Sequence, residues 1–467
     1  MKHQHNKKAP LRLLTLAFPL LLSAGLSHTA QADVVYQDQA KLHEIVQKIS
    51  ADNIKKDVVK LVNFGTRHTL SETESDTRGI GAARRWIKSE FDAISKQCGG
   101  CLEVYYQSRV IEGETRIPNA TEVVSVIAIQ RGTSDDNRFV LMSGDIDSRV
   151  SDPMNFTSDS PGANDNASGV AGTLEAARVL SQYKFNGSIV YAALAGEEQG
   201  LFGGKILAEA AQKDGWRLKA VLNNDMIGNI AGINGVINNT SARVFAEGTR
   251  MTETADEARA RRFTGGEVDS PSRNLARYID WIADRYIPNL DTMVIYRLDR
   301  FGRGGHHRPF NDLGYPAVRI METNENYNHQ HQDLRTENGI EYGDTLAGVN
   351  FPYAAKLTSL NAASLASMAW APSPPAKVDI KGAVQPSTTL SWAALDKKQN
   401  PQLAGYKIYW RYTDAPQWQY SKYVGDVTEY TLDNIVIDNY FFGVASVSKE
   451  GYESPVVFPG AAGAFGE

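Results

Sequence analysis

Four short polar clusters of this 467-residue sequence contain the acidic and histidine side chains that could perform chemistry. They contain Asp165, the adjacent pair Glu197 and Glu198, Asp225, and His329. Each cluster alone has a structural explanation, because Asp and Asn also favour helix caps and turns. Four such clusters in one region favour instead a metal site of carboxylates and imidazoles, and these ligand types suit zinc.

Short apolar runs of β-type residues precede these clusters. The patterns predict strands over 139–142, 188–194, 219–222 and 316–320, and helices over 81–94, 168–182, 271–286 and 342–368. Asp145 follows the first predicted strand, Glu197 and Glu198 follow the second, and Asp225 follows the third. Because open α/β sheets carry their sites beyond the carboxyl ends of the strands, we expect these side chains at one edge of the sheet.

The order of strands and helices divides the chain into two folded domains. Residues 33–371 predict an α/β domain in which helices flank a mostly parallel mixed sheet. Residues 376–460 predict a small all-β sandwich, because short strands there are separated by turns without a helical pattern. The Pro-rich residues 372–375 between them are interpreted as a semi-rigid linker that few contacts cross.

The C-terminal region resembles a fibronectin type III domain. The resemblance rests on a Leu-x-Trp segment that begins at Leu390 and a Gly-Tyr-x-Ile-Tyr segment that begins at Gly405. It implies a module that binds or spaces and carries no chemistry, with a protein or polysaccharide surface as its expected partner.

The bulk composition excludes several classes of protein. A hydrophobic content of 42% against 22% charged residues excludes a mainly disordered chain. The formal net charge is −5, and no long block of Lys and Arg occurs beyond the first dozen residues. We therefore expect neither nucleic acid nor an anionic membrane as a partner.

The N-terminus has the pattern of a signal peptide over residues 1–32. Basic residues precede an apolar run from Leu13 to Leu26, and Ala30-Gln31-Ala32 supplies a small-x-small cleavage site. The run is short for a retained membrane anchor, which is the alternative. The mature chain is therefore expected to begin at Asp33, to be secreted or periplasmic, and to have no membrane contact after cleavage.

Export also bears on the two cysteines of the sequence, Cys98 and Cys101. A Cys-x-x-Cys pair can be half of a zinc site or a redox motif, but no second pair exists here. A local disulfide in an oxidising compartment is the favoured interpretation.

The order of the polar motifs resembles the co-catalytic two-zinc aminopeptidase family, of the secreted bacterial leucine aminopeptidase type in metallopeptidase clan MH. The motifs are Asp-x-Ala-Ser-Gly at Asp165, Glu-Glu-x-Gly at Glu197, Asn-x-Asp-Met at Asn223, and His329 with an Asp four residues on. The resemblance covers residues 53–368 and implies the zinc exopeptidase fold, two zinc ions per chain and peptide substrates.

The resemblance also implies a role for each matching residue. Asp165 is expected to bridge two zinc ions, and Glu198 and Asp225 are each expected to complete the ligand shell of one metal. His329 is the expected histidine ligand on the Glu198 side, and His331 is the alternative without the family spacing. Glu197 is the expected general base, which takes a proton from the attacking water.

Two positions depart from the family pattern. The first zinc ligand of the family is the histidine of a His-x-Asp-Ser motif, and Asp145 stands at that position here. Asp145 is therefore the expected ligand, with a single-zinc site and an ion pair between Asp147 and Arg149 as the alternative. The segment that begins at Gly304 resembles Gly-x-Asp-His-x-Pro-Phe and has a second histidine in place of its Asp.

The next residue of that segment, His307, matches a family residue near the reacting carbonyl. It is expected to donate a hydrogen bond to the tetrahedral intermediate. The alternative is a loop histidine with a structural role. His306 is the residue that replaces the family Asp.

Together these features predict an exported zinc-dependent exopeptidase, by preference an aminopeptidase that hydrolyses the N-terminal residue of peptides. A carboxypeptidase or a glutaminyl cyclase on the same scaffold is one alternative, since kinship of fold does not separate these reactions. A binding protein with an impaired metal domain is the other. The pair Glu197 and Glu198 argues against it, because a binding protein has no need of an unligated carboxylate beside a metal.

Overall fold

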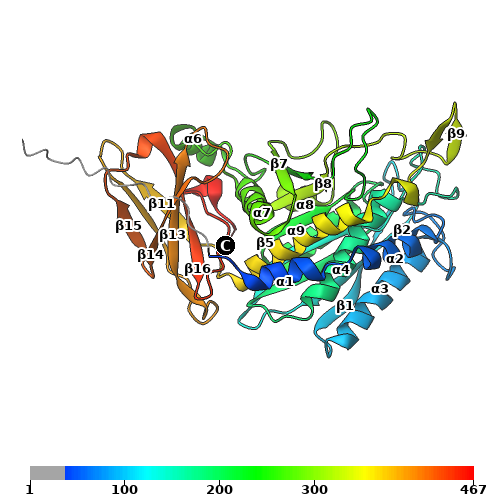
Figure 1. Cartoon of the computed structure of the whole chain (residues 1–467), viewed down its shortest axis with the longest axis horizontal. Helices are drawn as coiled ribbons and strands as arrows, with labels where there is room; N and C mark the ends of the chain where they lie inside the picture. The colour runs from blue at the N-terminus through cyan, green and yellow to red at the C-terminus, as the bar shows by residue number, and fades with distance from the viewer. Residues whose placement is uncertain (1–36, 467) are drawn as a thin grey trace, which may run out of the picture.

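The computed structural model describes residues 37–466, and its larger part is built around one eight-stranded sheet (Figure 1). The strand order is β1-β2-β4-β3-β5-β8-β6-β7, with β1 (Leu102–Ile111), β2 (Thr121–Gln130), β3 (Asp135–Asp145), β4 (Gly187–Leu194), β5 (Arg217–Asn224), β6 (Ser241–Phe245), β7 (Asp291–Ile295) and β8 (Ala317–Glu322). The central neighbours β4, β3, β5 and β8 run parallel, whereas β1, β2 and the β6–β8 pair are antiparallel. The predicted mixed α/β sheet is confirmed.

Helices cover both faces of this sheet. They are α1 (Ala40–Lys48), α2 (Ala51–Val62), α3 (Gly79–Gln97), α4 (Gly169–Leu180), α5 (Phe202–Lys213), α7 (Pro271–Tyr286), α8 (His307–Asp312) and α9 (Phe351–Trp370). Within β3, Val140 and Met142 join the core under α4 and α9, while Phe139 and Leu141 join the core under α5 and α8. Burial on both faces explains why the central strands are nearly continuous apolar runs.

The last long helix begins later than the sequence pattern suggested. α9 begins at Phe351, where the side chain of Asn350 accepts a hydrogen bond from the backbone N–H of Tyr353. The preceding residues form a small hairpin of β9 (Arg335–Glu337) and β10 (Ile340–Tyr342). The loops before this hairpin are therefore free to contribute to the site.

The C-terminal region is an all-β sandwich, as predicted. One sheet contains β11 (Ala376–Lys381), β12 (Thr388–Ala393) and β15 (Glu429–Leu432), and the other contains β14 (Tyr420–Gly425), β13 (Leu403–Tyr412) and β16 (Tyr440–Ser448). Leu390 from the first sheet and Ile408 and Phe442 from the second pack into one apolar cluster. The short helix α6 (Ala255–Thr264) lies beside this sandwich (Figure 1).

The interpretation of residues 372–375 as a linker that few contacts cross is wrong. Residues 371–375 are all buried. Arg138 of β3 is buried and donates to the backbone carbonyl of Ala371 at 2.9 Å, and the hydroxyl of Ser373 donates to Asp135 at 3.1 Å. The Pro-rich segment is thus clamped against the central sheet, because its carbonyls and hydroxyl satisfy buried polar groups there.

A buried ionic contact joins the sandwich to the α/β domain. The guanidinium of Arg411, on β13, donates to both carboxylate oxygens of Asp269 at 2.8 and 2.9 Å, and Arg277 donates to the same carboxylate at 2.9 Å. All three side chains are buried. The sandwich is therefore part of the packing of the α/β domain.

Two further sequence predictions concern the chain termini and the cysteines. The predicted signal peptide, residues 1–32, lies outside the described residues. Cys98 and Cys101 form the predicted disulfide. Within residues 37–466, no helix is long and apolar enough to cross a membrane.

Replacing Arg411 with Met tests this interface. The substitution leaves one side of the Asp269 carboxylate uncompensated, so we expect it to lower the free energy of unfolding by on the order of 3 kcal/mol. Arg262→Met on the exposed face of α6 is the matched control, and it should change stability little. The measurement is urea unfolding of both variants, and equal midpoints would show that the contact carries no stability.

Candidate metal centre and active site

The polar clusters predicted from the sequence do meet at one edge of the sheet. Asp145 ends β3, Glu197 and Glu198 follow β4, and Asp225 follows β5, so the parallel strands bring them to the same side. A cavity of about 600 Å³ opens here, lined by Asp165, Glu197, Glu198, Asp225 and His331 together with several basic side chains. These side chains therefore meet at one edge of the sheet, as the strand pattern predicted.

Three of these residues form a compact group of metal-ligand type: Asp165, Glu198 and His331. Their ligand atoms all lie within 4.8 Å of one another. The Nε2 atom of His331 is 2.9 Å from Asp165 Oδ2 and 2.7 Å from Glu198 Oε1. Two carboxylates and one imidazole are a set of protein ligands that holds a catalytic zinc and leaves a coordination position open for water or substrate.

The histidine of this group is His331, whereas the sequence favoured His329. His331 has a positive φ of 52°, and this left-handed turn in the loop before β9 lies next to the carboxylates. His329 is outside the group, and its Nδ1 is near Gly348. The turn at His331, and not the family spacing of His329, therefore brings an imidazole next to the two carboxylates.

Electrostatics hold the three side chains in ligand-competent positions. Burial lowers the pKa of His331, but the charge of Glu198 and the hydrogen bond with Asp165 outweigh it and raise the pKa to about 9. Burial raises the pKa of Asp165, but His331 outweighs burial and holds this pKa below its ordinary value. The trio keeps a net negative charge even with His331 protonated, so a divalent cation can replace the proton of His331.

Arg149 braces the metal-binding trio from one side. Its Nε donates to Glu198 Oε2 at 2.7 Å, and its Nη2 lies 2.7 Å from His331 Nδ1. The alternative ion pair between Asp147 and Arg149 is not formed. Asp147 instead accepts the backbone N–H groups of Glu197 at 3.1 Å and of Glu198 at 3.0 Å.

This use of Asp147 fixes the turn that presents the two glutamates. Asp147 is buried, and Thr69 donates to its second oxygen at 3.1 Å. Asp344 has the same role for the segment that carries Asp165: its two oxygens accept the backbone N–H groups of Asn164 at 2.8 Å and Asp165 at 2.6 Å. This role of Asp344 could not be predicted from the sequence, because its partner Asp165 lies 179 residues away.

Glu197 lines the cavity but does not belong to the metal-binding trio. Burial raises its pKa well above the ordinary value, and the negative charges of Glu198 and Asp225 raise it further. A carboxyl with a raised pKa next to a metal position can accept a proton and keep it during a reaction. This placement agrees with the predicted role of Glu197, which it does not test.

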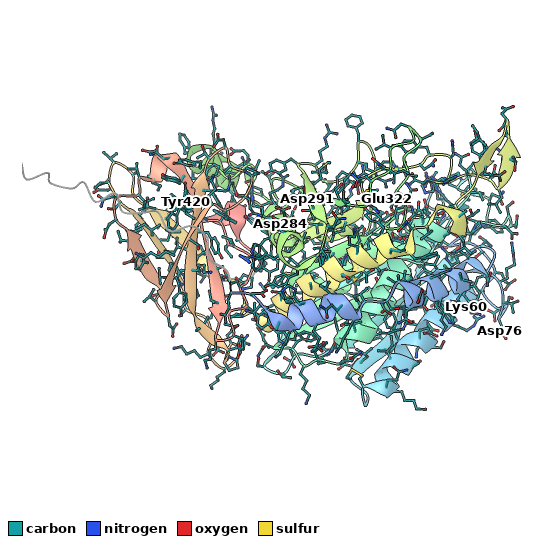
Figure 2. The ribbon with its side chains drawn as sticks, in the orientation of Figure 1. Lys60, Asp76, Asp284, Asp291, Glu322 and Tyr420 are labelled. Atoms are coloured by element: carbon teal, nitrogen blue, oxygen red, sulfur yellow. A yellow bond between two sulfur atoms is a disulfide. The ribbon has the colours of Figure 1, made fainter. Side chains whose placement is uncertain are left out.

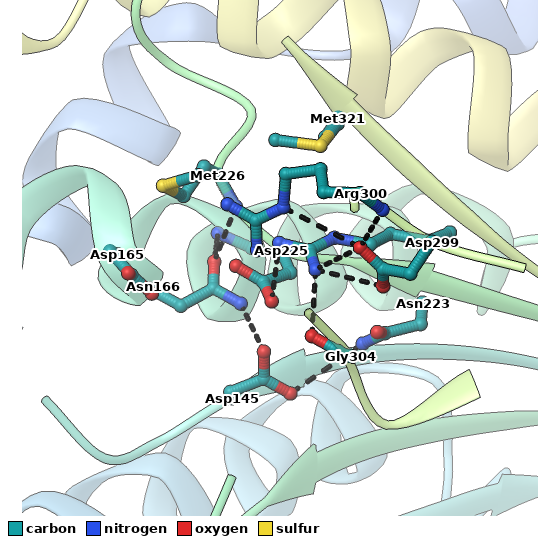
Figure 3. Close-up of polar contacts among 12 residues, drawn as sticks. Asp145, Asp165, Asn166, Asn223, Asp225, Met226, Asp299, Arg300, Gly304 and Met321 are labelled. Carbon is teal, nitrogen blue, oxygen red and sulfur yellow. Dashed lines mark hydrogen bonds and ion pairs between the residues drawn. The ribbon is translucent and has the colours of Figure 1, made fainter. Parts of the chain in front are cut away.

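Asp145 and Asp225 are each engaged by nitrogen donors (Figure 3). Asp145 accepts from Asn166 Nδ2 at 2.7 Å, and its other oxygen lies 2.5 Å from His306 Nδ1. Asp225 Oδ2 lies 2.7 Å from Nη2 of Arg319, which is fully buried. Neither carboxylate belongs to a group of metal-ligand type among residues 37–466.

His307 lies behind the cavity wall. It is fully buried, its Nε2 is 2.8 Å from the backbone carbonyl of Leu298, and it is 3.6 Å from Asp299. It is not among the residues that line the cavity. The arrangement therefore favours the structural role over the predicted contact with a tetrahedral intermediate.

A second acidic group occurs far from this site. Asp280, Asp284 and Asp291 lie on α7 and at the start of β7, and Figure 2 shows Asp284 and Asp291 nearer to the sandwich than Glu322, which ends β8. Glu322 accepts from Asn164 Nδ2 at 2.8 Å and supports the loop that carries Asp165. Glu322 is thus a support of the metal-binding trio and not a member of a second metal site among residues 37–466.

The fit to zinc differs between the two expected positions. The ligand atoms of Asp165, Glu198 and His331 meet around one position, where a metal ion would replace only the proton on His331. At the other position, N–H donors already hold the carboxylates of Asp145 and Asp225. The described residues therefore fit one zinc ion and do not fit a second.

A mixed sheet with metal ligands and a free carboxylate at its strand ends is the arrangement of a metal-dependent hydrolase. Comparison with known proteins gives the family. The sequence profile of Peptidase family M28 matches residues 125–345, which contain the entire site. A probable zinc metalloprotease of Leptosphaeria maculans is 43% identical over 422 residues, which cover 90% of this chain and 97% of that protein.

A probable zinc metalloprotease of Pyrenophora teres f. teres is 41% identical over 422 residues, which cover 90% of this chain and 86% of that protein. The LapA aminopeptidase of Legionella pneumophila shares the fold, with a TM-score of 0.52 and 20% identity over 73% of this chain and 78% of that chain. The chain therefore belongs to peptidase family M28. It is a zinc metallopeptidase.

The two neighbouring histidines allow a matched test of the metal position. We expect His331→Ala to lose zinc during dialysis, because it removes one of only three protein ligands. His329→Ala should retain zinc and serves as the control from the same loop. The measurement is zinc content by elemental analysis after dialysis, and the opposite result would restore His329 as the ligand.

Proposed function

We propose that this chain is an exported zinc exopeptidase, by preference an aminopeptidase that hydrolyses the N-terminal residue of peptides. Glu197 is its general base. The observation that carries the proposal is the pairing of adjacent glutamates, in which Glu198 belongs to the metal-binding trio while Glu197 faces the same cavity outside it.

The chain's own residues suit this reaction. Glu197 accepts a proton from the attacking water on its carboxylate and transfers it to the leaving amine, a role that suits its raised pKa. Asp147 holds the backbone of both glutamates, so the base keeps its distance from the metal position during the transfer. Zinc, when bound by Asp165, Glu198 and His331, supplies the Lewis acid that polarises the scissile carbonyl.

The preference for an N-terminal residue rests on the motif resemblance to two-zinc aminopeptidases. LapA of Legionella pneumophila, which shares the fold of this chain, is also an aminopeptidase. The predicted signal peptide supports export. The carboxypeptidase and glutaminyl cyclase alternatives use the same scaffold, and a substrate panel separates them: peptides with a free amine, a blocked amine, or an N-terminal glutamine.

Glu197→Gln tests the role of the base. The amide fits the same space but cannot accept a proton, so we expect kcat to fall by about 100- to 10,000-fold while the zinc content stays unchanged. Glu337→Gln, on the exposed β9 strand, is the control and should retain full activity. A loss smaller than about tenfold would count against general-base catalysis by Glu197.

A further inference from the structure

Arg319 lies behind the cavity, where its guanidinium contacts the carboxylates of Asp225 and Asp299. It lies on β8, opposite Asn223 of β5, so the sheet directs it to the same edge as Asp225. Its Nη2 is 2.7 Å from Asp225 Oδ2, and its Nη1 donates to Asp299 at 3.0 and 3.1 Å and to the carbonyl of Gly304 at 2.9 Å. The side chain is fully buried.

The carboxylate of Asp145, the other ligand expected at the second metal position, is also held by protein nitrogen atoms. Asp145 is buried between Asn166 and His306, which both approach its oxygens with nitrogen atoms. Asp145 and His306 are the two positions that depart from the family pattern, and here they contact each other. Asp145, in contact with the imidazole of His306, thus stands at the position where the family pattern has a histidine ligand.

We propose that Arg319 takes the place of a second metal ion, so that the active site of this chain holds a single zinc. A guanidinium does not lose its proton in proteins, so the positive charge beside Asp225 is permanent. A second divalent ion would have to displace Arg319 from Asp225 and then remain beside this buried charge. The chain balances its second group of carboxylates with arginine, and only the trio of Asp165, Glu198 and His331 binds metal.

The test is the metal stoichiometry of the full chain from Asp33 onward. Metal-free protein is titrated with zinc, and bound metal is measured by equilibrium dialysis with elemental analysis. We expect one tight zinc per chain. Two zinc ions bound with similar affinity would overturn the proposal, whatever the activity of the protein.

Substitution of Arg319 tests its part in excluding the second ion. Arg319→Ala frees Asp225, and we expect it to bind a second, weaker zinc ion. Arg300→Ala is the matched control: Arg300 lines the same cavity but pairs with Glu325 at 2.7 Å, so its loss should leave the stoichiometry at one. A folded Arg319→Ala protein that still binds one zinc would remove this role, and the titration of the unmutated chain decides stoichiometry if the variant does not fold.

Basic side chains outnumber acidic ones on the cavity wall, and this observation is independent of Arg319. The basic residues are Arg116, Arg149, Lys205, Arg300, Arg303 and Arg308, and the acidic residues are Asp165, Glu197, Glu198, Asp225 and Asp312. Zinc binding would make the difference larger, because two of the carboxylates belong to the metal-binding trio.

Four of these basic residues have no acidic partner among the described residues. Arg149 pairs with the carboxylate of Glu198 and Arg300 with that of Glu325, whereas Arg116 donates to the backbone carbonyl of Glu198. Lys205 on α5, Arg303 in the preceding loop of α8, and Arg308 on α8 are exposed at the cavity and form no ion pair within residues 37–466. The helices α5 and α8 pack on each other, so Lys205 and Arg308 belong to one wall.

The geometry points to a substrate with an anionic group near the scissile bond. Lys205, Arg303 and Arg308 would receive either the side-chain carboxylate of Asp or Glu or the terminal carboxylate of a short peptide. This inference rests on the proposed peptidase function and adds its substrate class. Unpaired guanidinium and ammonium groups around a partly closed cavity attract such a group with little competition from protein carboxylates.

Isosteric substrates test this inference. We compare kcat/KM for peptides with N-terminal Glu and Gln, and for the same peptides with a free or an amidated C-terminus. We expect at least about a fivefold preference for one carboxylate over its amide at low salt, decreasing as ionic strength rises. The Glu–Gln comparison and the acid–amide comparison identify which carboxylate is recognised.

The double variant Arg303→Gln, Arg308→Gln should lose that preference while it retains zinc, and Arg262→Gln on α6 should keep it. Equal hydrolysis of each carboxylate substrate and its amide would overturn the inference and leave the peptidase function intact. Failure to hydrolyse any peptide of the panel would instead contradict the proposed function.

Discussion

The positive charge that balances the buried carboxylates at the carboxyl ends of β3, β4 and β5 is the interaction on which the site depends. Asp145, Asp165, Glu198 and Asp225 converge there because the strands run parallel. Uncompensated, such a group would be costly to bury. The chain compensates one half with His331 and Arg149, beside the position that fits zinc, and the other half with Arg319.

This division of charge separates two functions within the site. The half that contains His331 can exchange the proton of this imidazole for zinc, and Glu197 lies beside it with a raised pKa. In the other half, the guanidinium of Arg319 lies 2.7 to 3.1 Å from carboxylate oxygens and a carbonyl oxygen, and these contacts hold it in place. Chemistry is therefore concentrated at Asp165, Glu198 and His331, while the other half maintains the shape of the cavity floor.

The sequence predicted much of this arrangement, because local signals determine which residues end a strand. Apolar runs followed by Asp145, Glu198 and Asp225 were sufficient to predict the α/β sheet and the edge that carries the site. The choice of His331 over His329 could not be predicted, because it depends on a left-handed turn within the loop. The partner of Asp225 was also hidden, since Arg319 is an unremarkable residue of an apolar strand until the sheet brings the two together.

The Pro-rich residues 372–375 are a second feature whose contacts could not be predicted from the sequence. Prolines at residues 372–375 mark the boundary between two folding patterns, and the structure has α9 end and β11 begin on either side of it. Composition does not reveal that Arg138 and Asp135 of the distant strand β3 bind this segment. Long-range polar contacts, rather than local propensity, join the sandwich to the domain that carries the site.

The most direct test of a single-zinc centre is anomalous diffraction at the zinc absorption edge from crystals of the zinc-loaded protein. The account predicts one peak, between the side chains of Asp165, Glu198 and His331. A second peak of similar height between Asp145 and Asp225, with Arg319 displaced, would contradict it.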